Sequence, residues 1–130
     1  MLIYKQLDDV QTGVYNCYLE LAYLNVQQGA YTKAEAYCKQ VVAIAKQYQF
    51  EYEDTRIYRF LTLVAMNKNE FSKALRYSQK GLTLALAQNN PQYIIGHYQD
   101  LGNLHNQIHD FEKAIYYLKK VIELAKDTRS

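Results

Sequence analysis

Proline, glycine and cysteine are all scarce in this chain of 130 residues, which has one proline, five glycines and two cysteines. So few backbone-breaking residues exclude collagen-like and low-complexity proteins, and they disfavour an all-β protein with many tight turns. Two cysteines are also too few for a small domain held together by disulfides. We therefore expect a protein whose thiols are reduced and whose fold rests on a hydrophobic core.

An excess of charge of one sign is absent too, because 15 Lys and Arg face 13 Asp and Glu, a formal net charge of +2. This balance argues against nucleic-acid binding by phosphate neutralisation, and against a polybasic protein of the membrane surface. The longest unbroken apolar run, Val41 to Ala45, is far shorter than the roughly 20 residues of a membrane span. The N-terminus lacks the layout of a signal peptide, so we expect a soluble, cytoplasmic protein.

What the chain does have is an internal repeat with a period of 40 residues. Aromatic, leucine and alanine positions recur in register three times, and 49% of the residues are hydrophobic, which is enough for a substantial core. Three units at one fixed period predict a stacked array of repeats. The clearest matching sets are Tyr18, Tyr58 and Tyr98; Leu21, Leu61 and Leu101; Ala34, Ala74 and Ala114; and Tyr37, Tyr77 and Tyr117.

Each unit is predicted to form two helices, because its apolar residues are spaced by three and four. Asp54 and Asp110 suit helix N-caps, Asn90-Pro91 signals a helix start, and Gly29 tolerates the left-handed backbone that ends a helix. The predicted helices are 12–28, 31–48, 54–68, 71–88, 91–108 and 111–127. Residues 1–10 are expected to be the tail of a helix from an earlier unit, so that the array begins partway through that unit.

The third unit resembles the tetratricopeptide repeat, because it contains Tyr98-x-x-Leu101-Gly102-x-x-His105 followed by Ala114-x-x-x-Leu118. The resemblance implies an all-α, right-handed superhelix of three helix hairpins in one domain, 1–130, with units of about 12–48, 52–88 and 91–127. Small residues such as Ala34, Ala74 and Ala114 are then expected to be buried where the two helices of a hairpin meet. The period departs from the roughly 34 residues of the family, and HEAT repeats, with periods near 40, are the alternative.

Long, tyrosine-rich units of this kind resemble one subgroup, the peptide-sensing regulators of Gram-positive bacteria (RNPP-type). That resemblance implies binding of a signalling peptide in quorum sensing and transcription regulation, with this segment as the sensing half, because no DNA-binding segment lies within it. A structural adaptor for self-assembly is the other alternative. The clamp with which chaperone-binding members grip an acidic C-terminus is absent from the corresponding positions.

Chemistry-bearing residues do not form a catalytic or metal-binding pattern. Cys17 and Cys38 are interpreted as small buried residues rather than as a disulfide or reactive thiols. His105 and His109 lie four residues apart, but His105 occupies an aromatic position between helices and His109 falls in a turn. Gly-rich phosphate loops and nucleophile elbows are missing. The sequence therefore predicts no enzyme, no metal and no cofactor.

The candidate binding surface is the concave groove, which the first helix of each unit lines in tetratricopeptide arrays. Amide side chains there are able to hold an extended peptide backbone, two arginines are able to hold a carboxylate, and the apolar residues offer pockets. The alternative is that the polar residues are simply the solvated faces of helices. The predicted groove residues are Tyr23, Gln27, Arg56, Arg59, Phe60, Leu63, Asn67, Gln99, Asn103 and Asn106.

Both ends of the array are predicted to present apolar residues. The last helix carries Ile115 and Ile122 on a broad apolar surface that the preceding helix covers on one side only, and Leu2, Ile3 and Leu7 look like a helix without a partner. Exposed patches of this size usually mark an interface. We expect either self-association, most simply as a two-fold dimer, or cover from flanking segments of a longer protein.

Overall fold

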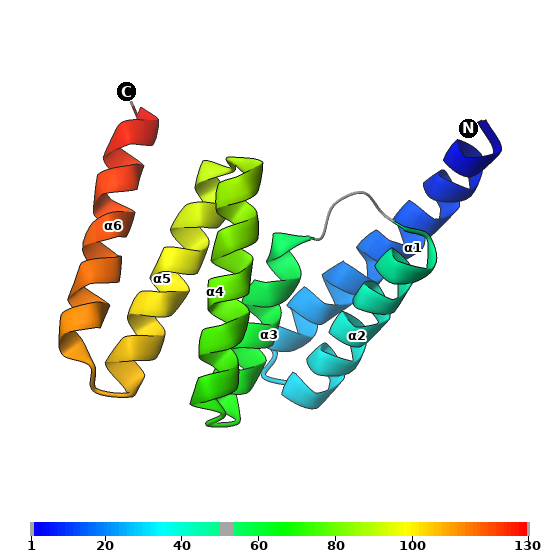
Figure 1. Ribbon diagram of the computed structural model, residues 1–130. Coiled ribbons are helices and arrows are strands. Elements are labelled where there is room, and N and C mark those ends of the chain that lie inside the picture. Colours follow the sequence, from blue (N-terminus) through cyan, green and yellow to red (C-terminus); the bar gives the residue numbers. More distant parts are fainter. Residues whose placement is uncertain (1, 50–53, 130) are drawn as a thin grey trace.

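The computed structural model describes residues 2–49 and 54–129, and the part it describes contains six α-helices. They form three hairpins in sequence, which confirms the all-α prediction (Figure 1). The helices are α1 (Leu2–Gln27), α2 (Tyr31–Gln47), α3 (Thr55–Asn67), α4 (Phe71–Gln88), α5 (Pro91–Gln107) and α6 (Phe111–Arg129).

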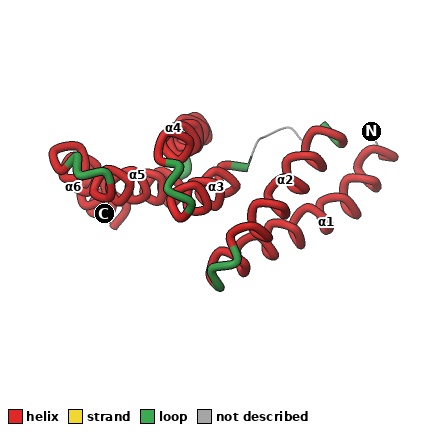
Figure 2. Tube along the Cα trace, turned by 90° about the horizontal axis from the view of Figure 1, so that it is seen from below, coloured by secondary structure: helices red, strands yellow, loops and turns green. Residues whose placement is uncertain are grey.

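The hairpins stack so that the second helix of one unit packs on the first helix of the next. Beyond the contacts within hairpins, α2 contacts α3 and α4 contacts α5. The first helices also touch one another, α1 against α3 and α3 against α5. As a result α1 and α6 belong to opposite ends of the array, as both ribbon views show (Figures 1 and 2).

The helix ends follow the local signals in the sequence. Residues with positive φ recur at the turns inside the hairpins, at Gly29, Asn69 and His109, and such residues end a helix with a left-handed backbone. The Asp54 side chain accepts a hydrogen bond from the backbone N–H of Arg56, as an N-cap does. Two other helix starts repeat this pattern, with Asn90 accepting from Tyr93 and Asp110 accepting from Lys113, whereas the N-caps Ala30 and Glu70 have no side-chain capping bond.

The start of the chain differs from the prediction. We expected residues 1–10 to belong to a separate helix, but α1 runs without interruption from Leu2 to Gln27. The segment has no proline, and its one glycine, Gly13, is accommodated inside the helix. The sequence therefore contains no residue that would end the helix before Gln27. The side chains of Leu2, Ile3 and Leu7 lie outside those that the structure describes.

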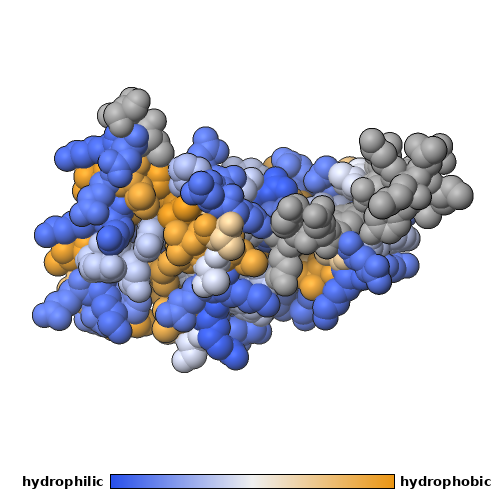
Figure 3. All heavy atoms as spheres, turned by 45° about the horizontal axis from the view of Figure 1, so that its top comes forward, coloured by the Kyte–Doolittle hydropathy of each residue, from blue (hydrophilic) through white to orange (hydrophobic). Residues whose placement is uncertain are grey.

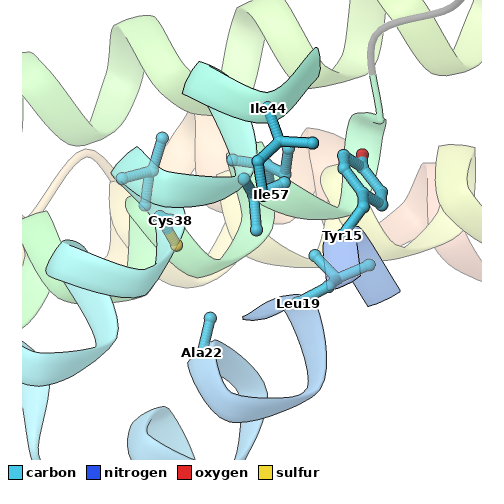
Figure 4. Packing of buried hydrophobic residues seen from close by; sticks show 8 residues of the cluster. Tyr15, Leu19, Ala22, Cys38, Ile44 and Ile57 are labelled. Atoms are coloured by element: carbon cyan, nitrogen blue, oxygen red, sulfur yellow. The ribbon is translucent and has the colours of Figure 1, made fainter. Parts of the chain in front are cut away.

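Small residues let the paired helices approach closely, as predicted. Ala34 and Ala74 are completely buried, and Ala114 is 4% exposed. A Cβ on Gly102 of α5 would lie 2.7 Å from side-chain carbons of Leu118 on α6. This position therefore requires a residue without a side chain. Around these contacts the core forms clusters across neighbouring helices. Figure 4 shows the one that joins α1, α2 and α3, whose labelled members are Tyr15, Leu19, Ala22, Cys38, Ile44 and Ile57.

Candidate binding surfaces

The predicted groove residues at the α1–α3 junction do come together. The rings of Tyr23 on α1 and Phe60 on α3 lie 5.8 Å apart between centroids, within the range of a favourable aromatic pair. Gln27, one turn after Tyr23, donates a hydrogen bond of 2.7 Å from its amide nitrogen to the tyrosine hydroxyl. Tyr23 is 42% exposed, so this group offers an aromatic and an amide surface to a partner.

Arg59 is not free to hold a ligand carboxylate, which corrects the expectation from sequence. Its guanidinium binds Asp100 of α5 through two hydrogen bonds of 2.8 and 3.0 Å, a bidentate pair across neighbouring first helices. Gly96 makes room for it, because a Cβ there would lie 2.9 Å from a guanidinium nitrogen. Burial raises the pKa of Asp100 despite this partner, whereas the hydrogen bonds that Arg59 donates to Asp100 raise the pKa of Arg59.

Arg56 is also engaged, by the carboxylate that caps its own helix. Two nitrogens of its guanidinium lie 2.9 and 2.6 Å from the oxygens of Asp54. The Tyr15 hydroxyl of α1 bonds to the same carboxylate. Burial works to raise the pKa of Asp54, but the Arg56 bonds and charge outweigh it and lower that pKa. The two arginines therefore tie helices and caps together instead of presenting a site for a free carboxylate.

The other predicted groove residues lie on α3 and α5. Leu63 is half-buried and Asn67 is exposed at the end of α3. The amides Gln99, Asn103 and Asn106 are all exposed on α5. Their spacing of three and four residues places them along one side of that helix. The amide part of the predicted site thus remains open to solvent.

A second hollow, which the sequence did not predict, lies between α2 and α4 over α3. Its volume is about 440 Å³, a size typical of ligand pockets. The lining contains four lysines and arginines against one glutamate, an excess of three positive charges in a chain whose net charge is +2. Two aromatic rings provide apolar walls. The residues are Glu35, Cys38, Lys39, Val42, Tyr58, Leu61, Lys73, Arg76, Tyr77 and Lys80.

The sequence contained only a weak signal for this hollow. Its cations stand on the outer faces of two second helices that are about 40 residues apart, where solvated lysines are ordinary. Lys80 lies 5.3 Å from the ring centroid of Tyr58, and Lys73 lies 6.0 Å from that of Tyr77. Such pairs hold the ammonium groups at the walls of the hollow. The hollow is suited to an anionic segment with an apolar side chain.

Buried histidines and cysteines serve packing in this structure. His97 is fully buried, and its Nε2 lies 2.6 Å from the Thr55 hydroxyl, which donates to the carbonyl of Gly81 at 2.7 Å. Burial raises the pKa of the Cys38 thiol to about 12, so it is no nucleophile. Cys17 is exposed, which corrects the prediction that both cysteines are buried.

Neither a metal site nor a membrane span is found in the described part of the chain. Among residues 2–49 and 54–129, no three histidine, cysteine or acidic side chains gather as metal ligands would. None of the helices in the same ranges is long and apolar enough to cross a membrane. The His105 ring instead stacks on Tyr117 at 5.5 Å between centroids, as its aromatic position in the repeat predicts.

Comparison with known proteins supports the assignment of the repeat. Residues 16–48 match one model of the tetratricopeptide repeat, and residues 98–128 match another. The matched segments fall on parts of the first and third hairpins, and the second hairpin has the same helix order at the same spacing. No match was found among curated proteins.

Proposed function

We propose that the chain, which matches models of the tetratricopeptide repeat over residues 16–48 and 98–128, binds a peptide or protein segment in its concave groove without catalysis, because arrays of this repeat are scaffolds for protein interaction. The observation that supports this most directly is the row of exposed amides on α5, Gln99, Asn103 and Asn106. Amides offer donors and acceptors that match an extended backbone. The exposed face of Tyr23 and Gln27 adds an aromatic contact on α1.

The internal ion pairs refine this proposal. Since Arg56 and Arg59 already bind carboxylates of the chain, the groove is suited to the backbone and apolar side chains of a peptide rather than to its acidic groups. The hollow between α2 and α4 has the opposite character, with its excess of positive charge and its aromatic walls. We propose it as a second surface, for an acidic segment.

One narrower hypothesis follows from resemblance. The tyrosine-rich units with a 40-residue period support the proposal that the segment is the sensing part of a peptide-responsive bacterial regulator in the cytoplasm. Reading the complete gene tests this, because such a regulator carries a DNA-binding helix-turn-helix or acts on a separate partner protein. A gene with neither contradicts it.

A binding screen tests the two surfaces separately. The probes are two pools of fluorescein-labelled heptapeptides, one neutral and one containing two glutamates, and titrations of the best binders follow. We expect the double variant Asn103→Ala/Asn106→Ala to weaken the neutral peptides about tenfold, from the loss of two hydrogen bonds worth roughly 0.5–1.5 kcal/mol each. Lys39→Ala/Arg76→Ala should weaken only the acidic ones.

The control is Lys119→Ala on the exposed surface of α6, which should change neither affinity. Unfolding midpoints of all variants are measured first, because exposed polar changes should leave them nearly unchanged. Peptides that bind equally well to both double variants would contradict the assignment of these surfaces, and a wild-type chain that binds neither pool would contradict the proposal itself.

A further inference from the structure

An apolar stripe runs along the exposed side of α1. Its residues are spaced alternately by four and three, which keeps them on one side of a helix as in the seam of a coiled coil. Val10 is 64% exposed, Leu21 37% and Leu24 45%, and Cys17 is exposed as well. The stripe consists of Val10, Val14, Cys17, Leu21 and Leu24 and is called the α1 stripe below.

Residues at the same repeat positions in the later units are buried. Forty residues after Cys17, Leu21 and Leu24 stand Ile57, Leu61 and Val64 of α3, which are 4%, 9% and 1% exposed. Ile57 and Leu61 belong to one cluster with residues of α2, the second helix of the preceding unit. Eighty residues after Leu21 and Leu24 stand Leu101 and Leu104, both fully buried. The α1 stripe is therefore the receiving face for the second helix of another unit, and no helix within residues 2–49 and 54–129 covers it.

The last helix, α6, has the complementary apolar face, and that face is exposed as well. Ile115 is 54% exposed, Leu118 38% and Ile122 56%, and Figure 3 shows hydrophobic atoms gathered at this end of the molecule. Forty and eighty residues before Leu118 stand Ser78 and Cys38, both fully buried. These three residues, together with Phe111, form the α6 stripe, again spaced by four and three.

The internal junctions show which faces fit together. In both junctions a second helix packs on a first helix, α2 on α3 and α4 on α5. Leu75 of α4, forty residues before Ile115, packs against the cluster that contains Leu104 of α5, eighty residues after Leu24. A junction of the same kind between two copies would bring Ile115 of one copy to Leu24 of the next.

The charges of the two end helices favour the same pairing. Among the side chains that the structure describes, α1 has one charged residue, Glu20, a net charge of −1. Those of α6 comprise four lysines against three carboxylates, a net charge of +1. Pairing α6 with α1 joins opposite charges, whereas pairing α1 with α1 or α6 with α6 would join like charges.

We propose that the α6 stripe of one copy docks on the α1 stripe of a second copy, so that the chain assembles head to tail and continues its own superhelix. This is an alternative to the two-fold dimer expected from the sequence. A heterologous contact of this kind does not close on itself, so the assembly grows with protein concentration instead of stopping at two copies.

Two variants that each block one end test the proposal. Leu21→Glu/Leu24→Glu blocks the α1 stripe, and Ile115→Lys/Ile122→Lys blocks the α6 stripe. Sedimentation velocity is recorded for the wild type and both variants at protein concentrations from about 5 to about 500 µM. We expect the wild type to form a rising series of oligomers and each variant alone to sediment as a monomer of 15.3 kDa.

The decisive sample is the equimolar mixture of the two variants. It holds one intact α6 stripe and one intact α1 stripe, so head-to-tail docking predicts a single species of twice the monomer mass that does not grow further. Leu86→Lys on α4, where Leu86 is 50% exposed away from both stripes, should assemble like the wild type. Far-ultraviolet circular dichroism checks that every variant is folded.

Three outcomes would overturn the proposal. A two-fold dimer through α6 would leave the α1-blocked variant dimeric, and one through α1 would leave the α6-blocked variant dimeric. A mixture of folded variants that stays monomeric, when the wild type assembles, would show that the stripes do not meet. A wild type that is monomeric throughout would leave the stripes as surfaces for neighbouring segments of a longer protein.

Discussion

The imidazole of His97 lies directly over the backbone of Gly81, where α5 crosses α4. A Cβ built on Gly81 would lie 2.8 Å from both ring nitrogens and closer still to the carbon between them. The Thr55 hydroxyl of α3 bridges the two residues, bonding the His97 ring and the Gly81 carbonyl. One buried contact therefore joins three helices from two units, and it depends on a residue without a side chain.

Replacing Gly81 by alanine should destabilise the protein. The added methyl group overlaps the His97 ring, and overpacking of this kind typically costs about 1–3 kcal/mol. The gain in helix propensity, up to about 1 kcal/mol, offsets only part of this cost. The measurement is the free energy of unfolding in urea.

Gly13→Ala is the matched control for this change. Gly13 also lies inside a helix, but a Cβ there meets nothing within 4 Å. The same substitution should therefore be neutral or stabilise α1 by up to about 1 kcal/mol. Equal effects at the two glycines would show that the His97 ring does not press on position 81.

Stability should fall in mild acid because of His97. Burial, and then the charge of Arg59, lower the pKa of His97 to about 4, compared with about 6.5 in the unfolded chain. Between these values the unfolded state binds more protons, so the free energy of unfolding decreases as the pH falls from about 6.5 to about 4. The loss attributable to this residue is at most about 3 kcal/mol. Urea titrations at several pH values measure it.

The variant His97→Gln isolates this contribution. It should be less stable at neutral pH, but its stability should vary less between pH 4 and 6.5, because the titrating group of His97 is gone. His109→Gln, at the exposed turn before α6, should keep the slope of the wild type. A slope that survives in His97→Gln would assign the acid sensitivity to other groups.

Removing Arg59 alone should destabilise the protein more than removing both Arg59 and Asp100. Arg59→Ala leaves the carboxylate of Asp100, whose residue is 3% exposed, without the guanidinium that binds it. Breaking a buried pair costs roughly 3–5 kcal/mol, and the lower end applies because the Arg59 side chain is 37% exposed. The double variant with Asp100→Ala should recover part of that loss in thermal unfolding. A double variant less stable than Arg59→Ala would contradict this account.

Several features of the fold could be predicted from the sequence because they depend on nearby residues. The 40-residue period, the six helices and the burial of Ala34, Ala74 and Ala114 follow from spacing, and the caps at Asp54 and Asn90 follow from side-chain type. The period also predicted the apolar surface of α6. The extent of α1 was missed because residues 1–10 were assigned to the tail of an earlier unit, whereas the helix runs unbroken from Leu2 to Gln27.

The contacts between units, in contrast, depend on the tertiary structure alone. Arg59 and Asp100 are 41 residues apart, and Thr55 and His97 are 42 apart, so each pair depends on the angle at which neighbouring hairpins pack. The same angle opens the hollow between α2 and α4. Periodicity shows which face of each helix is apolar, but it leaves the rotation between units undetermined. The sequence alone thus determined the repeated unit, whereas only the packing of units showed that the groove arginines are occupied and that the exposed stripe of α1 corresponds to residues buried in the later units.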